Sequence, residues 1–311
     1  MGRILYRSTD CAKSGHQHKG FQMTEIFNER KRLEISDLAD FLPYQKLDQI
    51  AKSNAAQYAS AQPYPHLVID GLFDSAVLDR ILAEFPAPSD KNWTFHDAAE
   101  EIKLQSETER DIPLYTRYFL YALNSGSFLK FLEKLTGIEN LIGDPHFVGG
   151  GLHQIVAGGK LGIHADFNKH ISFGLHRRLN MLIYLNKDWQ IEYGGDFELW
   201  ERSMTRRINK VAPLFNRTVI FTTSRYSYHG HPDPLNCPRD VTRKSLALYF
   251  YTNGGGSDED WSGRHSTLFQ PRPGERFKLS AKQIARGLTP PVLWRVASRV
   301  LRSGAPAHLG G

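Results

Sequence analysis

Apolar residues recur at helical spacing in the first part of the chain. The spacing predicts a helix over residues 36–59 that breaks at Pro43. A short apolar run at residues 66–70 then predicts a strand. A further helix is expected after Asp74, whose carboxylate can cap it, and before Pro86, which stops it.

Helical spacing of apolar residues occurs once more before residue 140, where this periodicity ends. It predicts a helix over residues 128–136, with Ser127 as the cap and Gly137 as the terminator. Residues 90–113 show neither a helical nor a strand period, and we expect them to be irregular. The polar residues 1–33 are expected to be poorly ordered or loosely docked.

Residues 140–253 lack helical periodicity. Short apolar runs there alternate with Gly, Asn, Asp and Pro, which is typical of a β-sandwich or barrel built from short strands. Together with the helices before it, this pattern predicts an α+β fold. The expected strands lie near residues 145–157, 179–185, 196–200, 218–222 and 245–252.

The end of the chain is basic and amphipathic. One short helix is expected after Ser280, and another with Thr289 as cap and Pro290 in its first turn. Such a tail can lie on a membrane or a partner, or it can pack on the sandwich with its charges in water. We expect the packed arrangement.

Composition and charge narrow the class of protein. The 311 residues include 41% hydrophobic and 23% charged residues, as in an ordinary globular protein. The net charge of +6 is scattered, without the basic and aromatic stripe that nucleic-acid binding needs. The two cysteines, Cys11 and Cys237, form no metal or disulfide pattern, which favours a reducing, cytoplasmic location. We expect no transmembrane segment, since no run of about 18 apolar residues occurs.

Residues 162–167 contain the pattern His-x-Asp at His164 and Asp166. On a strand, side chains two residues apart share a face, so an imidazole and a carboxylate would lie side by side. An iron(II) site of the facial type needs this pair, one further His and open positions. Because the pattern is common by chance, the pair alone leaves a metal site and an ordinary polar pair as equal alternatives.

A third ligand is available on another expected strand. His229 follows the apolar run 218–222, and His231 competes with it for the same role. A second His-x-Asp pattern also occurs at His231 and Asp233, but the proline between them favours a loop there. The proline next to His231 favours His229 as the ligand, and both histidines stay candidates at this point.

The apolar strand at the end of the predicted β-region carries one arginine. Arg243 and Ser245 lie on one face of it, and Leu246 and Leu248 lie on the other. Burying an unpaired guanidinium is costly. A carboxylate held in a planar fork by Arg243 explains the arrangement, so the pattern indicates a carboxylate-bearing ligand.

Taken in order, these motifs resemble the prolyl 4-hydroxylase-like branch of the iron(II)/2-oxoglutarate-dependent dioxygenases. The resemblance covers about residues 145–252, and residues 65–86 resemble the usual N-terminal support. One departure is the long connection between His229 and Arg243, which reads as an inserted loop at the mouth of the site. The motifs are His164-x-Asp166, residues 178–189, residues 194–199, Phe215-Asn216-Arg217, Ser227-x-His229-Gly230 and Arg243-x-Ser245.

The resemblance implies a fold and a domain organisation. The core would be a double-stranded β-helix (jelly-roll), with N-terminal supporting helices and short C-terminal helices. The expected division is an N-terminal polar and helical extension over residues 1–60, a dioxygenase domain over 61–256 with its jelly-roll near 140–253, and a basic helical tail over 257–311.

The resemblance also implies a set of site residues. Arg243 would bind the distal carboxylate of 2-oxoglutarate, and Tyr184 would add a hydrogen bond from a neighbouring strand. The implied cofactors are iron(II), 2-oxoglutarate and O₂, with ascorbate as an optional addition. The catalytic and metal-binding residues would be His164, Asp166 and His229, and the cofactor-binding residues Arg243, Tyr184, Ser245 and Asn180.

The implied activity is hydroxylation of an unactivated C–H bond, with release of succinate and CO₂. The substrate would be a prolyl or other side chain of a protein or peptide. A small-molecule hydroxylase of the same class is the main alternative. A zinc- or cupin-type metal protein and an inactive binding module are the others, and Arg243 argues against the zinc enzyme because such a site needs no carboxylate clamp. The oligomeric state does not follow from the sequence.

Overall fold

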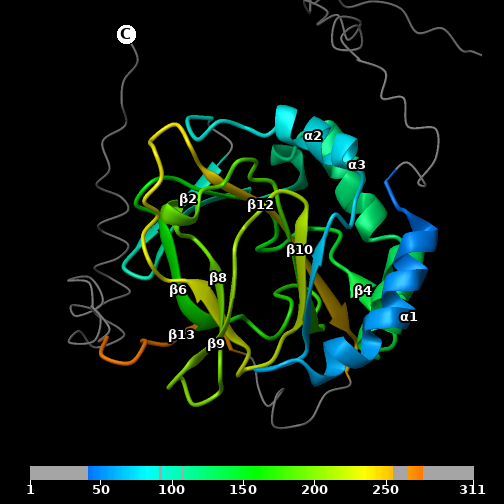
Figure 1. Cartoon of the computed structure of the whole chain (residues 1–311). Helices are drawn as coiled ribbons and strands as arrows, with labels where there is room; N and C mark the ends of the chain where they lie inside the picture. Colours follow the sequence, from blue (N-terminus) through cyan, green and yellow to red (C-terminus); the bar gives the residue numbers. More distant parts are fainter. Residues whose placement is uncertain (1–40, 91–92, 107, 255–264, 276–311) are drawn as a thin grey trace, which may run out of the picture. The chain divides into compact units, whose positions relative to one another are not determined.

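The structure is a computed structural model that describes residues 41–90, 93–106, 108–254 and 265–275 (Figure 1). These residues belong to one compact unit. The segment 1–33 and both expected C-terminal helices lie outside the described residues, so the division at residues 60 and 256 stays a prediction. Within the described part, no helix has the length and apolar character that crossing a membrane requires.

Four helices precede most of the strands. They are α1 (Tyr44–Ser60), α2 (Ser75–Ala83), α3 (Leu114–Leu123) and α4 (Gly126–Thr136). The strands are β1 (His66–Asp70), β2 (Trp93–Ala98), β3 (Glu101–Ser106), β4 (Ile142–Gly143), β5 (Gly151–Ile155), β6 (Lys160–Ala165), β7 (His176–Tyr184), β8 (Phe197–Trp200), β9 (Arg207–Val211), β10 (Arg217–Thr222), β11 (Tyr228–His231), β12 (Arg243–Thr252) and β13 (Leu268–Phe269).

The strands form one antiparallel sheet that curls into a nearly closed barrel. Its strand order is β1-β10-β7-β12-β5-β3-β6-β11-β8-β9, and β2, β4 and β13 pair off this path. The strands around β7, β12 and β5 face those around β6, β11 and β8, and β3 joins the two halves. This arrangement is jelly-roll-like, so the expected α+β class and jelly-roll core are confirmed.

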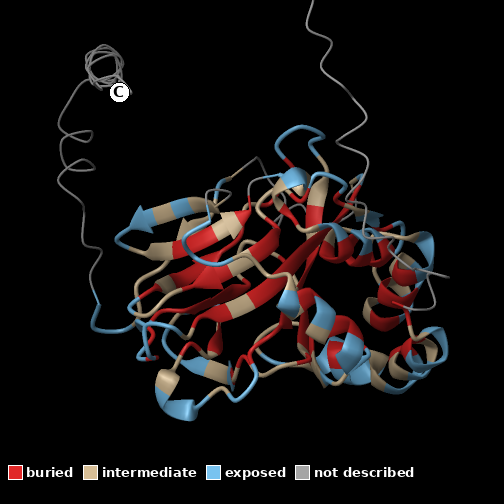
Figure 2. Cartoon of the chain, turned by 90° about the horizontal axis from the view of Figure 1, so that it is seen from above, coloured by how far each residue is buried: buried red, intermediate tan, exposed pale blue. Residues whose placement is uncertain are grey.

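The helices cover the outer side of one half of the sheet (Figure 1). Phe128 of α4 packs on Phe250 of β12, with ring centroids 6.4 Å apart. In Figure 2 the helices carry buried residues on the sides that face the sheet and exposed residues on the outside. Because residues on β12 alternate, Phe250 faces the helices while Arg243 and Ser245 line the interior cavity.

Several sequence expectations are confirmed with adjusted ends. The expected strand at residues 66–70 is β1. The helix after Asp74 is α2, and the Asp74 carboxylate accepts a hydrogen bond from the amide of Ala76. The part of the first expected helix that follows Pro43 is α1, whereas residues 36–40 lie outside the description. Gly137 ends α4 with a φ of 71°, as a terminating glycine should.

Two expectations were wrong. The cap of α4 is Ser125 rather than Ser127, because the Ser125 hydroxyl accepts the hydrogen bond from the amide of Phe128 and the helix starts earlier. Residues 90–113 are not irregular: they contain the hairpin of β2 and β3. These two strands are rich in charged and polar residues, so they lack the apolar run that would have indicated a strand.

Candidate metal centre

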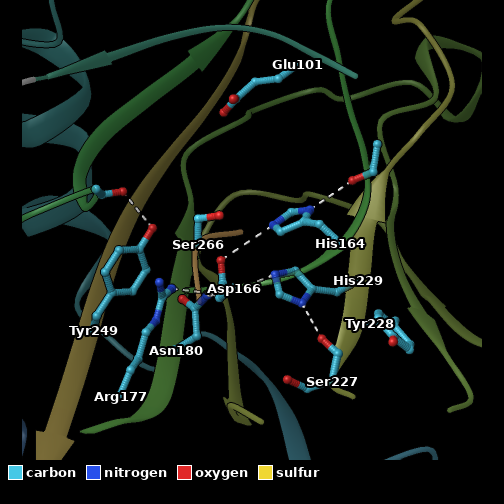
Figure 3. A network of polar contacts seen from close by, with 12 residues as sticks. Glu101, His164, Asp166, Arg177, Asn180, Ser227, Tyr228, His229, Tyr249 and Ser266 are labelled. Atoms are coloured by element: carbon cyan, nitrogen blue, oxygen red, sulfur yellow. Dashed lines mark hydrogen bonds and ion pairs between the residues drawn. The ribbon is translucent and has the colours of Figure 1, made fainter. Parts of the chain in front are cut away.

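Three of the predicted site residues meet at one point in the barrel (Figure 3). His164 lies on β6, Asp166 follows the end of that strand, and His229 lies on β11 directly opposite His164. The possible ligand atoms of the three side chains all lie within 4.8 Å of one another. Oxygen atoms of Asp166 lie 3.5 Å from Nε2 of His164 and 3.4 Å from Nε2 of His229. All three side chains are buried.

Backbone carbonyls orient both imidazoles. Nδ1 of His164 lies 2.8 Å from the carbonyl oxygen of Gly162, and Nδ1 of His229 lies 2.8 Å from that of Ser227. A ring that donates from Nδ1 presents the lone pair of Nε2, which is the form that binds a metal. Burial also lowers the pKa of His229, which favours the neutral ring.

The carboxylate of Asp166 is held by two further side chains of β7. Arg177 and Asn180 donate hydrogen bonds to its Oδ2 at 2.8 and 3.0 Å. Burial alone would raise the pKa of this carboxyl, but the charge of Arg177 holds it well below its usual range. Asp166 is therefore an anion before any metal binds. Asn180, which was expected to bind the cofactor, donates a hydrogen bond to this carboxylate.

The donor set fits a metal ion of the iron(II) type. Two neutral imidazole nitrogens and one carboxylate oxygen from three side chains are the facial set that leaves the other positions of the metal open. All three side chains line one cavity of about 260 Å³. Space for further ligands therefore exists beside the donor atoms.

The cavity extends from this cluster to Arg243. The guanidinium of Arg243 is buried. It donates from Nε to the carbonyl of Gly195 at 2.8 Å and from Nη2 to the hydroxyl of Tyr184 at 3.3 Å. No carboxylate forms an ion pair with Arg243 in the part of the chain that the structure describes. Ser245 lines the same wall and lies opposite Tyr184 in register. A buried cation whose hydrogen bonds go to neutral groups suits an anionic ligand.

The structure distinguishes His229 from His231, the other candidate for the third metal ligand. His231 is the last residue of β11 rather than the start of a loop. The loop begins with the next residue, Pro232. Among the described residues, His231 is not a member of the His164 and Asp166 cluster. His231 lines the same cavity, on the side of Arg243. Burial and, next, the charge of Arg243 hold the pKa of His231 well below its usual value.

Sequence reasoning missed several residues of the site. Arg177 is fully buried, with its guanidinium carbon 3.4 Å from the ring centroid of Tyr249. From the hairpin, Glu101 and Lys103 reach the cavity and form an ion pair of 2.8 Å. In Figure 3, Glu101 lies on the same side of the cluster as His164 and is set apart from the three ligand residues. Phe269 of β13 lies against the ring of His164, with centroids 5.4 Å apart.

Comparison with known proteins agrees with this geometry. Residues 150–251 match the sequence model of the 2OG-Fe(II) oxygenase superfamily. This match confirms the resemblance to iron(II)/2-oxoglutarate oxygenases that the motifs indicated. No curated protein matches the sequence significantly.

Solved structures that this chain resembles include prolyl hydroxylases. A prolyl hydroxylase from Trichoplax adhaerens, in complex with a hypoxia inducible factor oxygen degradation domain peptide fragment, matches with a TM-score of 0.50 and 16% identity, over 67% of this chain and 92% of that chain. A Pseudomonas putida prolyl-4-hydroxylase matches with a TM-score of 0.42 and 16% identity, over 67% and 100% of the two chains. HygX from Streptomyces hygroscopicus matches with a TM-score of 0.43 and 12% identity, over 60% and 83%. At 16% identity the similarity to the Trichoplax adhaerens structure is one of fold.

Proposed function

We propose that this protein is an iron(II)- and 2-oxoglutarate-dependent dioxygenase that hydroxylates an unactivated C–H bond, releasing succinate and CO₂. The observation that carries this proposal is a single cavity with two ends. One end holds the cluster of His164, Asp166 and His229, and the other holds the buried guanidinium of Arg243. A metal site alone would suit many enzymes, but the buried cation at the far end of the cavity calls for an anionic co-substrate.

In this proposal His164 and His229 would hold iron(II) through Nε2, and Asp166 through a carboxylate oxygen. Bound iron(II), with O₂ and 2-oxoglutarate, supplies the oxidising power that attacks a C–H bond and that no protein side chain has. Arg177 and Asn180 keep Asp166 ionised and fixed before any metal arrives. The supporting carbonyls keep both imidazoles in the tautomer that binds a metal.

The far end of the cavity would bind and orient the co-substrate. Arg243 would bind its distal carboxylate, and the Tyr184 hydroxyl, already bonded to Arg243, would lie beside it. Ser245 and the neighbouring apolar residue Leu182 would line the space between. An apolar wall excludes water and strengthens the attraction of a guanidinium for a carboxylate.

For the substrate class we propose a prolyl or other side chain of a protein or peptide. The Trichoplax prolyl hydroxylase of the same fold is in complex with a peptide, which supports this choice. The cavity of about 260 Å³ must accept the co-substrate as well, so the remaining space suits one side chain better than a large ligand. A small molecule is the alternative, favoured by the charged pair of Glu101 and Lys103 at the cavity.

A spectroscopic titration tests the co-substrate assignment. We expect a weak visible absorption band when iron(II) and 2-oxoglutarate are added together to the wild-type protein without oxygen. Arg243→Ala should lose the band or show it only at much higher 2-oxoglutarate concentration, because the carboxylate loses its cationic partner. A matched control is Arg217→Ala, since Arg217 pairs with the exposed Asp70 outside the cavity.

The titration also separates the alternatives. A zinc- or cupin-type protein, or an inactive module, would give no band with the wild-type chain. A band that is the same in Arg243→Ala would contradict the clamp but not the metal site. Succinate formation on admission of oxygen, measured over background, then reports turnover.

A further inference from the structure

His231 is a buried imidazole to which the proposed chemistry assigns no role. Its side chain is only 4% exposed, and its Nδ1 has no hydrogen-bond partner among the described residues. A buried ring nitrogen without a partner costs free energy of folding. A purely packing residue at this position would do better with an apolar side chain. Nδ1 itself has no accessible surface, so a ligand in the cavity that His231 lines would meet Nε2, the other ring nitrogen.

The strand places His231 between the two ends of the cavity. His229 and His231 share one face of β11, about 7 Å apart along the strand. His229 lies opposite His164, whereas His231 lies opposite Leu161, three residues earlier on β6. Arg243 begins the strand that follows the loop after His231, and it lines the same cavity. The ring of His231 is thus beside the path from the metal cluster to Arg243.

The chemistry of the ring matches an oxygen-rich anion. A neutral imidazole offers one N–H donor, and a carboxylate is an acceptor only. Glu101, which lines the same cavity, has a side chain that is 22% exposed. His231 is more deeply buried, on the side of Arg243, where the proposed co-substrate must lie.

We propose that His231 is a further binding residue for 2-oxoglutarate, donating a hydrogen bond from its ring to a carboxylate oxygen between the metal cluster and Arg243. This inference rests on the proposed function of the site. His231 adds affinity and holds the chain of the dicarboxylate in line, while Arg243 and Tyr184 hold its end.

Binding measurements without turnover test the inference. Calorimetry with manganese(II) in place of iron(II) gives the Kd for 2-oxoglutarate in wild type, His231→Leu and His231→Gln. His231→Leu should raise this Kd at least about tenfold, as expected for one lost hydrogen bond to a charged group. His231→Gln keeps an N–H donor and should recover most of the affinity. The ligand-free His231→Leu protein should be as stable as wild type or more stable, because the unpartnered nitrogen is gone.

A second buried histidine provides the control. His66 of β1 lies outside the cavity, with Nδ1 2.9 Å from the carbonyl of Tyr64 and Nε2 3.3 Å from Asn209. We expect His66→Leu to lower stability because it breaks satisfied hydrogen bonds, and to leave the Kd for 2-oxoglutarate unchanged. His231→Leu should therefore change the Kd for 2-oxoglutarate without loss of stability, and His66→Leu should lower stability without a change in this Kd.

Each failure has its own signature. A His231→Leu protein that binds 2-oxoglutarate like wild type would overturn the inference and leave the proposed function standing. A His231→Leu protein that does not fold would make His231 a structural residue and also overturn it. If His231→Gln loses as much affinity as His231→Leu, ring volume rather than a hydrogen bond is responsible. A wild-type protein that binds no 2-oxoglutarate with metal would overturn the proposed function itself.

Discussion

The carboxylate of Asp166 receives more support than either imidazole of the cluster. Its Oδ2 accepts hydrogen bonds from Arg177 and Asn180 and lies 3.4 Å from His229, while Oδ1 faces His164 at 3.5 Å. The guanidinium that provides this support is fully buried and lies over the ring of Tyr249. The charge of Arg177 and the charge of Asp166 therefore depend on each other, and removing either leaves a buried charge unpaired.

Replacing Arg177 by Met should expose this dependence. Methionine keeps most of the apolar volume but leaves Asp166 without its cation, so we expect the free energy of unfolding to fall by about 3 kcal/mol at neutral pH. Urea unfolding of the metal-free protein measures the loss. A matched control is Arg178→Met, since Arg178 is partly exposed and its hydroxyl partner, Thr252, lies away from the cluster. Equal losses in both variants would contradict the special role of Arg177.

The same variant should change the response to acid. The folded-state pKa of Asp166 is depressed, so its contribution to stability is present above the unfolded-state pKa and is lost as pH falls through the lower folded-state pKa. Without Arg177 the folded-state pKa of Asp166 rises, and the stability should be lost at a higher pH than in wild type. Unfolding curves collected across the acidic range check this shift.

Strand periodicity explains what the sequence could reveal about the site and where it failed. The period of two correctly put Asn180 and Tyr184 on one face of β7, and His164 beside Asp166. It could not find Arg177, because the pairing of β7 with β12 shifts by one residue between Phe250 and Tyr251. This β-bulge reverses the alternation, so that Arg177 faces the cluster. The hairpin of β2 and β3 was missed for a different reason, since charged side chains that face a cavity interrupt the apolar pattern.

Close contact between β11 and β6 depends on Gly230. A Cβ added there would lie 2.6 Å from the carbonyl oxygen of Gly162 and 2.8 Å from that of Leu161, both backbone atoms of β6. Gly230→Ala should therefore push β11 away from β6 and move His229 relative to His164. We expect a loss of about 1–3 kcal/mol in stability and a metal affinity about tenfold weaker, measured by unfolding and by manganese(II) titration.

Another glycine gives the control for this substitution. Gly126, the first residue of α4, has no atom within 4 Å of an added Cβ. Gly126→Ala should leave metal affinity unchanged and stability equal or slightly higher. An unchanged metal affinity in Gly230→Ala would show that the cluster tolerates separation of its two strands.

Across the whole molecule, the site is divided between the two halves of the sheet. His164 and His229 belong to β6 and β11, whereas Arg243 and Tyr184 belong to β12 and β7. Strand β3 pairs with β5 on one side and β6 on the other, and so joins the halves. Local patterns predicted the strands and the class of fold, but pairing across the barrel is a long-range property. For the same reason, the contact of β13 with β6 had no counterpart in the sequence reasoning.

Ligands that bind the site should stabilise the whole molecule. Manganese(II) should raise the Tm, and 2-oxoglutarate added afterwards should raise it further, since each binds the folded protein alone. At a concentration one hundred times the Kd, each ligand contributes about 2.7 kcal/mol. Arg243→Ala should keep the manganese increment and lose most of the 2-oxoglutarate increment, as followed by thermal denaturation. A 2-oxoglutarate increment without metal would contradict a two-ended site.

Strand β3 joins the two halves, so the closed sheet as a whole sets the distance between the metal ligands and Arg243. The metal ligands belong to β6, to the residue that follows it and to β11, and Arg243 belongs to β12. Asp166 is also held by Arg177 and Asn180 of β7, so the two halves meet at the cluster as well. A dicarboxylate that is shorter or longer than this distance can reach the metal or the guanidinium of Arg243, but not both. Selection by length would then be a property of the closed sheet rather than of any single side chain.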